Sequence, residues 1–260
     1  MAILKSTTDL AALRHSAKIL RATMYTLEDH LKPGISAAEL DRIAIDFIRK
    51  QGGEPSFLGY QGYRYALCTS VNNEVVHGVS SPEKIIPENG IVSLDLGVDY
   101  QGLFSDMAMT FVLGEVDPKV RYLVEKTKEA MLAAAKAAKA GKRVGDIGYA
   151  AGKVAKDAGL GNILELGGHG VGYAVHEEPF IMHAGTPGKG ARLFENQVIA
   201  IEPMLTLGSG DVEFDETTED GWTVRTLDGS LAAHWEHTVL ITKKGAELLT
   251  DLSREECVFS

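Results

Sequence analysis

Hydrophobic side chains recur every three or four residues in four segments of the chain, which is typical of helices with one buried face. Each segment stops at or near a glycine, and two of them carry helix-start signals. Ser36 with Glu39 forms a capping box, and Asp117 stands before Pro118. We therefore expect helices at residues 9–31, 36–52, 117–141 and 144–158.

Between the second and third helices the pattern changes to continuous apolar runs, which are typical of buried strands. Residues 91–98 and 103–112 are rich in β-branched and apolar residues, and the four residues between them supply turn chemistry. This stretch predicts a β-hairpin. A shorter strand is expected at 66–71, and a loop follows it at 72–78. We interpret the acidic stretch at 211–220 as a solvated loop.

The predicted hairpin contains two aspartates within its apolar strands. If Val98 faces Leu103, then Asp95 lies directly opposite Asp106 on the same face, with side chains about 5 Å apart. Like charges at that distance destabilise the pair, and a bound cation would offset the repulsion. A slipped register with one aspartate at the surface explains these two residues equally well.

The order helix, glycine, helix, glycine, strands occurs twice along the chain. The glycines between the paired helices, Gly34 and Gly141, are 107 positions apart, and the same offset leads from Asp95 to Glu202. Agreement at a chemically distinctive position favours an internal duplication. We therefore expect an α/β fold whose similar halves surround a shared cleft. We expect a single catalytic domain at residues 1–260. Its two halves are expected at 9–114 and 115–245.

Composition narrows the class of protein further. The 260 residues are 45% hydrophobic and 24% charged, which fits a globular protein with a sizeable core. A formal charge of −10 without a Lys/Arg cluster argues against a nucleic-acid substrate. Cys68 and Cys257 are too few for a disulfide framework. No apolar run of about 18 residues and no signal peptide is found, so we expect a soluble, cytoplasmic protein without a membrane segment.

The second half adds a histidine and two further acids to the candidate chemistry. His169 is flanked by glycines, which we interpret as letting the backbone approach a ligand or metal, since the dinucleotide-binding spacing is absent. Glu202 and Glu236 adjoin apolar strands. Each acid alone is more often a salt bridge or an exposed strand end. Four carboxylates with one imidazole, however, can hold two divalent ions ~3.5–4 Å apart and generate a bridging hydroxide at neutral pH. Such donors suit Mn, Fe, Co or Zn.

These residues and their surroundings resemble the five metal-ligand motifs of the type I methionine aminopeptidases. The motifs are Asp95 in SLDLGV, Asp106 in FSDMAMT, His169 in GGHGVG, Glu202 in IEPM and Glu236 in WEHTVL. The resemblance runs from near the N-terminus to about Thr242. It implies the pita-bread fold, with two pseudo-twofold-related halves around a central antiparallel sheet. It also implies a dinuclear metal enzyme that removes the initiator methionine from nascent polypeptides.

The resemblance implies roles for further residues. His77 in NNEVVHG would contact the scissile amide, and His176 in HEEP would steady the substrate carbonyl. We expect Glu202 to carry a proton from the attacking water to the leaving amine. The methionine side chain would lie among Phe57, Tyr60, Tyr63, Cys68 and Trp222. Without the family pattern, a loop histidine, a core or capping histidine and core aromatics are the simpler interpretations.

Three other functions fit parts of the same pattern. A peptidase of the same fold that cleaves X-Pro bonds usually carries an extra N-terminal domain, and the segment before Asp95 is too short for one. A non-enzymatic relative would have lost ligands, and none is lost here. A creatine-type hydrolase is expected to lack this set of acids. We expect a monomer that acts on the N-terminal methionine of nascent polypeptides, and the sequence leaves association with the ribosome open.

Overall fold

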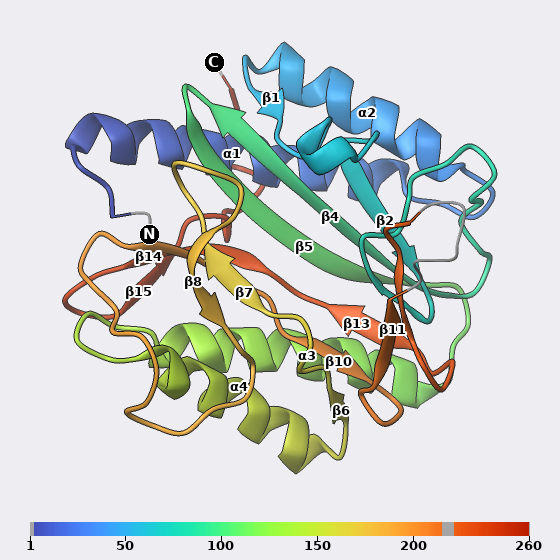
Figure 1. The fold of residues 1–260 in the computed structure, drawn as a ribbon. Helices are drawn as coiled ribbons and strands as arrows, with labels where there is room; N and C mark the ends of the chain where they lie inside the picture. Colours follow the sequence, from blue (N-terminus) through green and yellow to red (C-terminus); the bar gives the residue numbers. More distant parts are fainter. Residues whose placement is uncertain (1–2, 215–220, 260) are drawn as a thin grey trace.

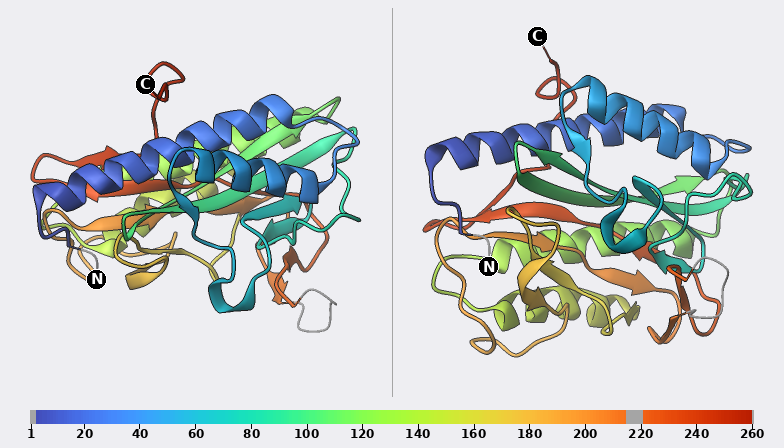
Figure 2. Two further views of the ribbon diagram at one scale, coloured as in Figure 1. Left: turned by 90° about the horizontal axis from the view of Figure 1, so that it is seen from above. Right: turned by 45° about the horizontal axis from the view of Figure 1, so that its top comes forward.

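Antiparallel sheets lie between two pairs of helices in the computed structural model, which describes residues 3–214 and 221–259 (Figure 1). The first helix pair covers one side of the sheets and the second pair covers the other side, as the turned views also show (Figure 2). In this described part of the chain the α-helices are α1 (Thr7–His30), α2 (Ala37–Lys50), α3 (Pro118–Ala137) and α4 (Val144–Ala158).

All four predicted helices are confirmed, and local signals explain most of their ends. The Ser36 hydroxyl accepts a hydrogen bond from the backbone N–H of Glu39, as the capping pattern predicts. The third helix ends earlier than expected, because Ala138 is already extended. The connection that follows is held by distant parts of the chain, since Ala140 N–H donates to the Thr242 carbonyl and Gly141 N–H to the Leu193 carbonyl.

Within the described residues the strands form four sheets, each of them antiparallel. The first contains β1 (Glu54–Pro55), β2 (Leu67–Val71), β4 (Gly90–Tyr100) and β5 (Leu103–Leu113). The five-stranded sheet has the order β15 (Ala246–Leu248), β14 (His237–Ile241), β9 (Val198–Ile201), β7 (Gly168–Gly170) and β8 (Glu177–Ile181). The smaller sheets are β13 (Ala232–His234) with β10 (Met204–Thr206) and β6 (Gly161–Asn162), and β11 (Val212–Phe214) with β12 (Val224–Thr226) and β3 (Glu74–Val76).

The predicted hairpin is present, but its predicted register is wrong by two residues. Tyr100 pairs with Leu103, so Asp95 lies opposite Ala108 and not opposite Asp106. The reason is the turn, in which Gln101 and Gly102 have φ of 55° and 79°. Two residues with positive φ make the tight turn that suits a twisted hairpin. A shift of two residues keeps every side chain on its face, so the two aspartates remain on one face as diagonal neighbours.

Threonine hydroxyls join the two halves along β5. The Thr238 hydroxyl donates to the Asp106 carbonyl at 2.7 Å and accepts from the Asp106 N–H at 2.8 Å. The Thr110 hydroxyl makes the same pair of bonds with the backbone of His234, at 2.8 Å and 2.9 Å. These side chains satisfy strand groups that would otherwise be buried without partners. The seam therefore fixes Asp106 beside the second half of the chain.

Each half has a hydrophobic core between its helices and its strands. One core packs Leu20 and Met24 of α1 against Leu94 of β4, and the other packs Met131 of α3 against Ile199 of β9. The interhelical glycines, Gly34 and Gly141, have similar φ of 86° and 90°. This likeness agrees with two related halves, whose boundaries at 9–114 and 115–245 stay a prediction.

Two further expectations concern the surface of the protein. The first part of the acidic stretch is not a loop, because Val212–Phe214 forms β11 and pairs with β12, whereas residues 215–220 lie outside the described part of the chain. Among the described residues, no helix is both long enough and apolar enough to cross a membrane.

Candidate metal centre and substrate cleft

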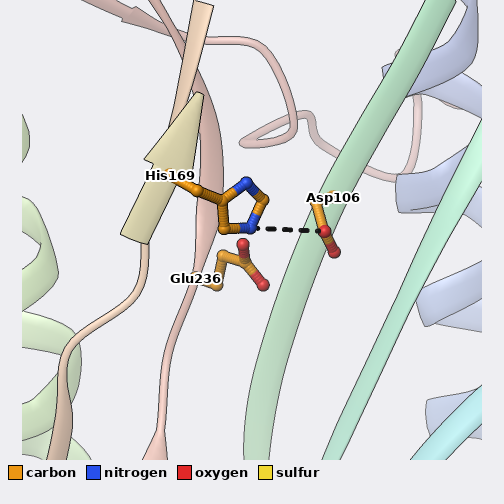
Figure 3. Close-up of side chains that lie close together, drawn as sticks. All are labelled: Asp106, His169 and Glu236. Carbon is orange, nitrogen blue, oxygen red and sulfur yellow. Dashed lines mark ion pairs between the residues drawn. The ribbon is translucent and has the colours of Figure 1, made fainter. Parts of the chain in front are cut away.

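Four buried acids and one buried histidine converge on a single cavity of ≈150 Å³. They come from β4, β5, β7, the end of β9 and the start of β14, so both halves contribute. Figure 3 shows the His169 ring directed toward Asp106, with Glu236 beside it. The residues that sequence reasoning selected as metal ligands, and that line this cavity, are Asp95, Asp106, His169, Glu202 and Glu236.

His169 presents a free lone pair to the carboxylates. Its Nδ1 donates to the Gly170 carbonyl at 2.9 Å, which leaves Nε2 as the acceptor nitrogen of the neutral ring. Nε2 lies 3.4 Å from Oε1 of Glu202 and 3.8 Å from Oδ2 of Asp106. Burial lowers the pKa of His169 to about 3, so the ring is neutral at physiological pH. A neutral imidazole held by its other nitrogen is the form that binds metal ions.

The carboxylates are crowded and poorly compensated by the protein itself. Burial, with the charge of Glu202, raises the pKa of Asp95 to about 7. Burial and the neighbouring carboxylates raise the pKa values of Asp106 and Glu236 well above their usual range. Within the described chain, Oδ1 of Asp95, Oδ1 of Asp106 and Oε1 of Glu236 have no hydrogen-bond partner. Buried anions of this kind are normally paired or bound to metal, so the donor set fits divalent cations.

Two sets of side chains in this cluster could each hold a metal ion, because the donor atoms within each set all lie within 4.8 Å of one another. One consists of Asp106, His169 and Glu236, and the other of Glu202, His234 and Glu236. Glu236 belongs to both sets, and the second set includes His234, which was not predicted as a ligand.

The glycines beside His169 serve the packing of the strands around them. A β carbon on Gly168 would lie 2.3 Å from the Ala200 carbonyl oxygen, and one on Gly170 would lie 2.3 Å from that of Glu178. These glycines therefore let β7 pack closely between β9 and β8, which explains them without a ligand, and the interpretation that they let the backbone approach a ligand or metal stays a prediction.

His77 and His176 both line the same cavity. His77 follows β3 with a φ of 58°, a backbone conformation that is uncommon for residues other than glycine and often occurs at functional sites. Burial lowers its pKa to about 4. The Nδ1 of His176 lies 3.0 Å from the Tyr60 hydroxyl, and its ring centroid lies 4.3 Å from that of His169.

The predicted methionine pocket adjoins the acidic cluster. Tyr63 packs edge-on against Trp222 with ring centroids 5.2 Å apart, and its hydroxyl lies 3.1 Å from the Leu67 carbonyl, to which it donates. Burial raises the pKa of the Cys68 thiol, which therefore stays protonated and acts as an apolar wall. The predicted pocket residues on this wall of the cavity are Phe57, Tyr60, Tyr63, Cys68 and Trp222, and Gln61, which sequence reasoning did not select, joins them.

A wider groove leads away from the acidic cluster. Its volume is ≈550 Å³, and it shares His77, His176 and Glu202 with the inner cavity. Beyond them its walls include Glu165 and Phe180. The inner cavity and the groove thus meet at the candidate metal centre.

Two buried histidines next to Glu202 were missed by sequence reasoning. His183 Nε2 accepts the backbone N–H of Glu202 at 3.2 Å, and His234 Nε2 lies 3.4 Å from Oε2 of the same residue. His234 could have been found, because it precedes Glu236 by two positions in a strand-like segment, where alternate residues share a face. His183 offers no such signal.

Comparisons with known proteins identify the family to which this chain belongs. The model of metallopeptidase family M24 matches residues 11–243. The methionine aminopeptidase of Aquifex aeolicus is 44% identical, over 96% of this chain and 98% of the relative. Methionine aminopeptidase 1 of Bacillus subtilis is 40% identical, over 96% of this chain and 99% of the relative.

Solved structures give the same answer for the fold. The methionine aminopeptidase structure from Thermotoga maritima is 39% identical, with a TM-score of 0.93 over 97% of this chain and all of that chain. The prolidase of Pyrococcus furiosus is 25% identical, with a TM-score of 0.78, but this chain covers only 66% of it. The pita-bread fold is thereby confirmed. The chain belongs to metallopeptidase family M24 and, within it, to the type I methionine aminopeptidases.

Proposed function

We infer that this protein is a metal-dependent aminopeptidase that removes the N-terminal methionine from nascent proteins and peptides. The main evidence for this function is that an aromatic cavity lies directly beside five buried side chains of the kind that bind metal ions. The similarity to methionine aminopeptidases over nearly the whole chain supports it. Two divalent ions, chosen among Co, Mn, Fe and Zn, would be held by Asp95, Asp106, His169, Glu202 and Glu236.

The cavity suits an unbranched apolar side chain at the end of a peptide. A thioether packs well against aromatic edges, and Tyr63 and Trp222 provide such edges at the wall. The inner cavity has room for one side chain, whereas the adjoining groove can take the rest of the peptide. One of the bound ions would take the free α-amine, which explains why only an N-terminal residue would be cleaved.

The side chains at the junction then have distinct roles. Divalent ions in such a site act as Lewis acids and lower the pKa of water toward neutrality. Glu202 carries the proton from the attacking water to the leaving amine. His77 hydrogen-bonds the scissile amide. The Tyr60 hydroxyl donates to Nδ1 of His176, so that Nε2 carries the proton and can donate to the substrate carbonyl.

We further propose that the protein acts in the cytoplasm as a monomer. Its two cysteines are buried and unpaired, which suits a reducing compartment, and one chain supplies every residue of the candidate site. A direct contact with the ribosome stays a hypothesis.

Substrate choice tests the proposed function. We expect release of methionine from Met-Ala-Ser, and a kcat/KM that is about 10- to 100-fold lower for Ala-Ala-Ser, because the smaller side chain buries less apolar surface. N-acetylated Met-Ala-Ser should resist cleavage. Free amino acids measured by mass spectrometry give the rates. Cleavage of Ala-Pro with Met-Ala-Ser left intact would instead identify an X-Pro peptidase.

Replacing His77 tests its proposed contact with the amide. The His77→Ala variant should lower kcat about 10- to 100-fold, which is the value of one hydrogen bond to a charged or polarised group. Its metal content, measured by plasma mass spectrometry, should equal that of the wild-type protein. His30→Ala, at an exposed histidine of α1, is the matched control. Loss of metal from the His77 variant would move this residue into the ligand set.

A further inference from the structure

His234 is a buried histidine that the roles proposed above leave unused. Its side chain is 1% exposed, and it is the last residue of β13. In the described part of the protein, neither of its ring nitrogens has a hydrogen-bond partner. A buried polar ring without partners destabilises a fold, so its presence beside the acidic cluster points to a function there.

The nearest charged atom to His234 belongs to Glu202. His234 Nε2 lies 3.4 Å from Oε2 of Glu202, whereas His169 Nε2 lies 3.4 Å from Oε1. The backbone N–H of Glu202 is bound by His183. The Glu202 carboxylate therefore lies between two imidazoles, one facing each of its oxygens.

The two imidazoles lie on different sides of the cavity wall. His169 and Glu202 line both the inner cavity and the groove, but His234 is absent from the walls of either. His234 therefore approaches Glu202 from outside the lining of both cavities. Because Glu202, His234 and Glu236 also have donor atoms within 4.8 Å of one another, direct ligation of a metal ion by His234 is the alternative that the experiment must separate from positioning. Its position is fixed by the backbone, because the Thr110 hydroxyl bonds both the N–H and the carbonyl of His234.

We propose that His234 is a positioning residue, whose Nε2–H donates to Oε2 of Glu202 and thereby turns Oε1 toward the cavity and the metal ions. The inference rests on the proposed function, since it requires Glu202 to act at a metal centre. The 3.4 Å contact is not a hydrogen bond in the structure, and forming the proposed bond would leave only the acceptor Nδ1 without a partner. Groups that orient a metal ligand from outside commonly control its affinity for the ion.

Metal affinity is the property to measure, with Co²⁺ added to metal-free protein in a calorimeter. His234→Leu removes the donor, and we expect its Co²⁺ affinity to fall about 10- to 100-fold. His234→Gln keeps an N–H donor and should restore most of the affinity. His237→Gln is the matched control, because His237 is equally buried but bonds Thr250, and its affinity should stay at the wild-type value.

A crystal structure of the Co²⁺-loaded protein separates positioning from direct ligation. In the positioning role, Nε2 of His234 faces Oε2 of Glu202 and lies beyond bonding distance of either ion. A Co²⁺ ion at about 2.1 Å from a ring nitrogen of His234 would make His234 a ligand and overturn the proposal. Equal affinity of wild type and His234→Leu would also overturn it.

Two more outcomes keep the test decisive. If the leucine variant does not fold, His234→Asn takes its place, because the shorter amide cannot reach Oε2 and the same loss of affinity is expected. Wild-type protein that binds no Co²⁺ would overturn the proposed metal centre, and the positioning role with it. Normal wild-type binding with no change in either variant would overturn the positioning role alone.

Discussion

Removing divalent ions with a chelator is expected to abolish hydrolysis of Met-Ala-Ser, and adding Co²⁺, Mn²⁺, Fe²⁺ or Zn²⁺ to restore it. The reason lies in the residues of the cavity. Buried Asp95, Asp106 and Glu236 each have an oxygen without a partner in the described chain, and His169 is neutral. None of these groups alone activates water at pH 7, whereas a divalent ion lowers the pKa of bound water toward neutrality. Methionine release before and after reconstitution measures the effect.

The choice of ion supplies the control for this experiment. An imidazole donor suits transition metals better than Mg²⁺ or Ca²⁺, which prefer oxygen ligands alone. Excess Mg²⁺ should therefore restore little activity. Robust turnover by metal-stripped protein would contradict the proposed chemistry.

Metal removal should also change how stability depends on pH. The pKa of Asp95 is raised to about 7, and the pKa values of Asp106 and Glu236 are raised well above their usual range, all chiefly by burial. Unfolded carboxyl groups have already lost their protons at that pH, so the folded metal-free protein binds more protons than the unfolded chain. Its free energy of unfolding should fall as the pH rises above 7.

The buried histidines do not reverse this trend. Burial lowers their pKa values, and it lowers that of His77 to about 4. Their contribution to the free energy of unfolding therefore grows with pH only up to the pKa of an unfolded histidine, near 6.5. Urea midpoints at pH 7 and pH 8.5 measure the effect. The gain in stability on adding metal should be larger at the higher pH, because metal binding releases protons. An equal gain at both values would contradict the expectation.

Replacing Glu202 by glutamine is expected to lower kcat/KM for Met-Ala-Ser by about 10²- to 10⁴-fold, the usual contribution of a general acid–base group. The amide keeps the shape of the side chain but cannot accept and return a proton. It also weakens ligation, so the variant should be assayed across a range of metal concentrations. A deficit that persists at saturating metal supports the proton-transfer role.

Glu165→Gln is the matched control, because Glu165 is an exposed glutamate on the groove wall. Its kcat/KM should stay close to that of the wild type. Full recovery of the Glu202→Gln variant at high metal concentration would restrict Glu202 to ligation and assign the proton transfer elsewhere.

Local signals in the sequence were enough to place the helices. The fourth helix covers the predicted residues, and the capping bond of Ser36 is present. The end of α3 was misplaced because tertiary hydrogen bonds, and not Gly141, decide where it stops. The predicted hairpin register was also wrong, because Gln101 shares the turn with Gly102 and adopts a positive φ that is not expected of glutamine.

The sequence by itself determined the α/β class, the hairpin with two aspartates on one face, and the five candidate donors, because periodicity and short motifs are local properties. Only the tertiary structure showed that these donors meet one aromatic cavity, that Thr110 and Thr238 tie the halves together, and that His183 and His234 flank Glu202. Such contacts join residues far apart in the chain. Their partners are chosen by packing and by the need to satisfy buried polar groups, which no local pattern encodes.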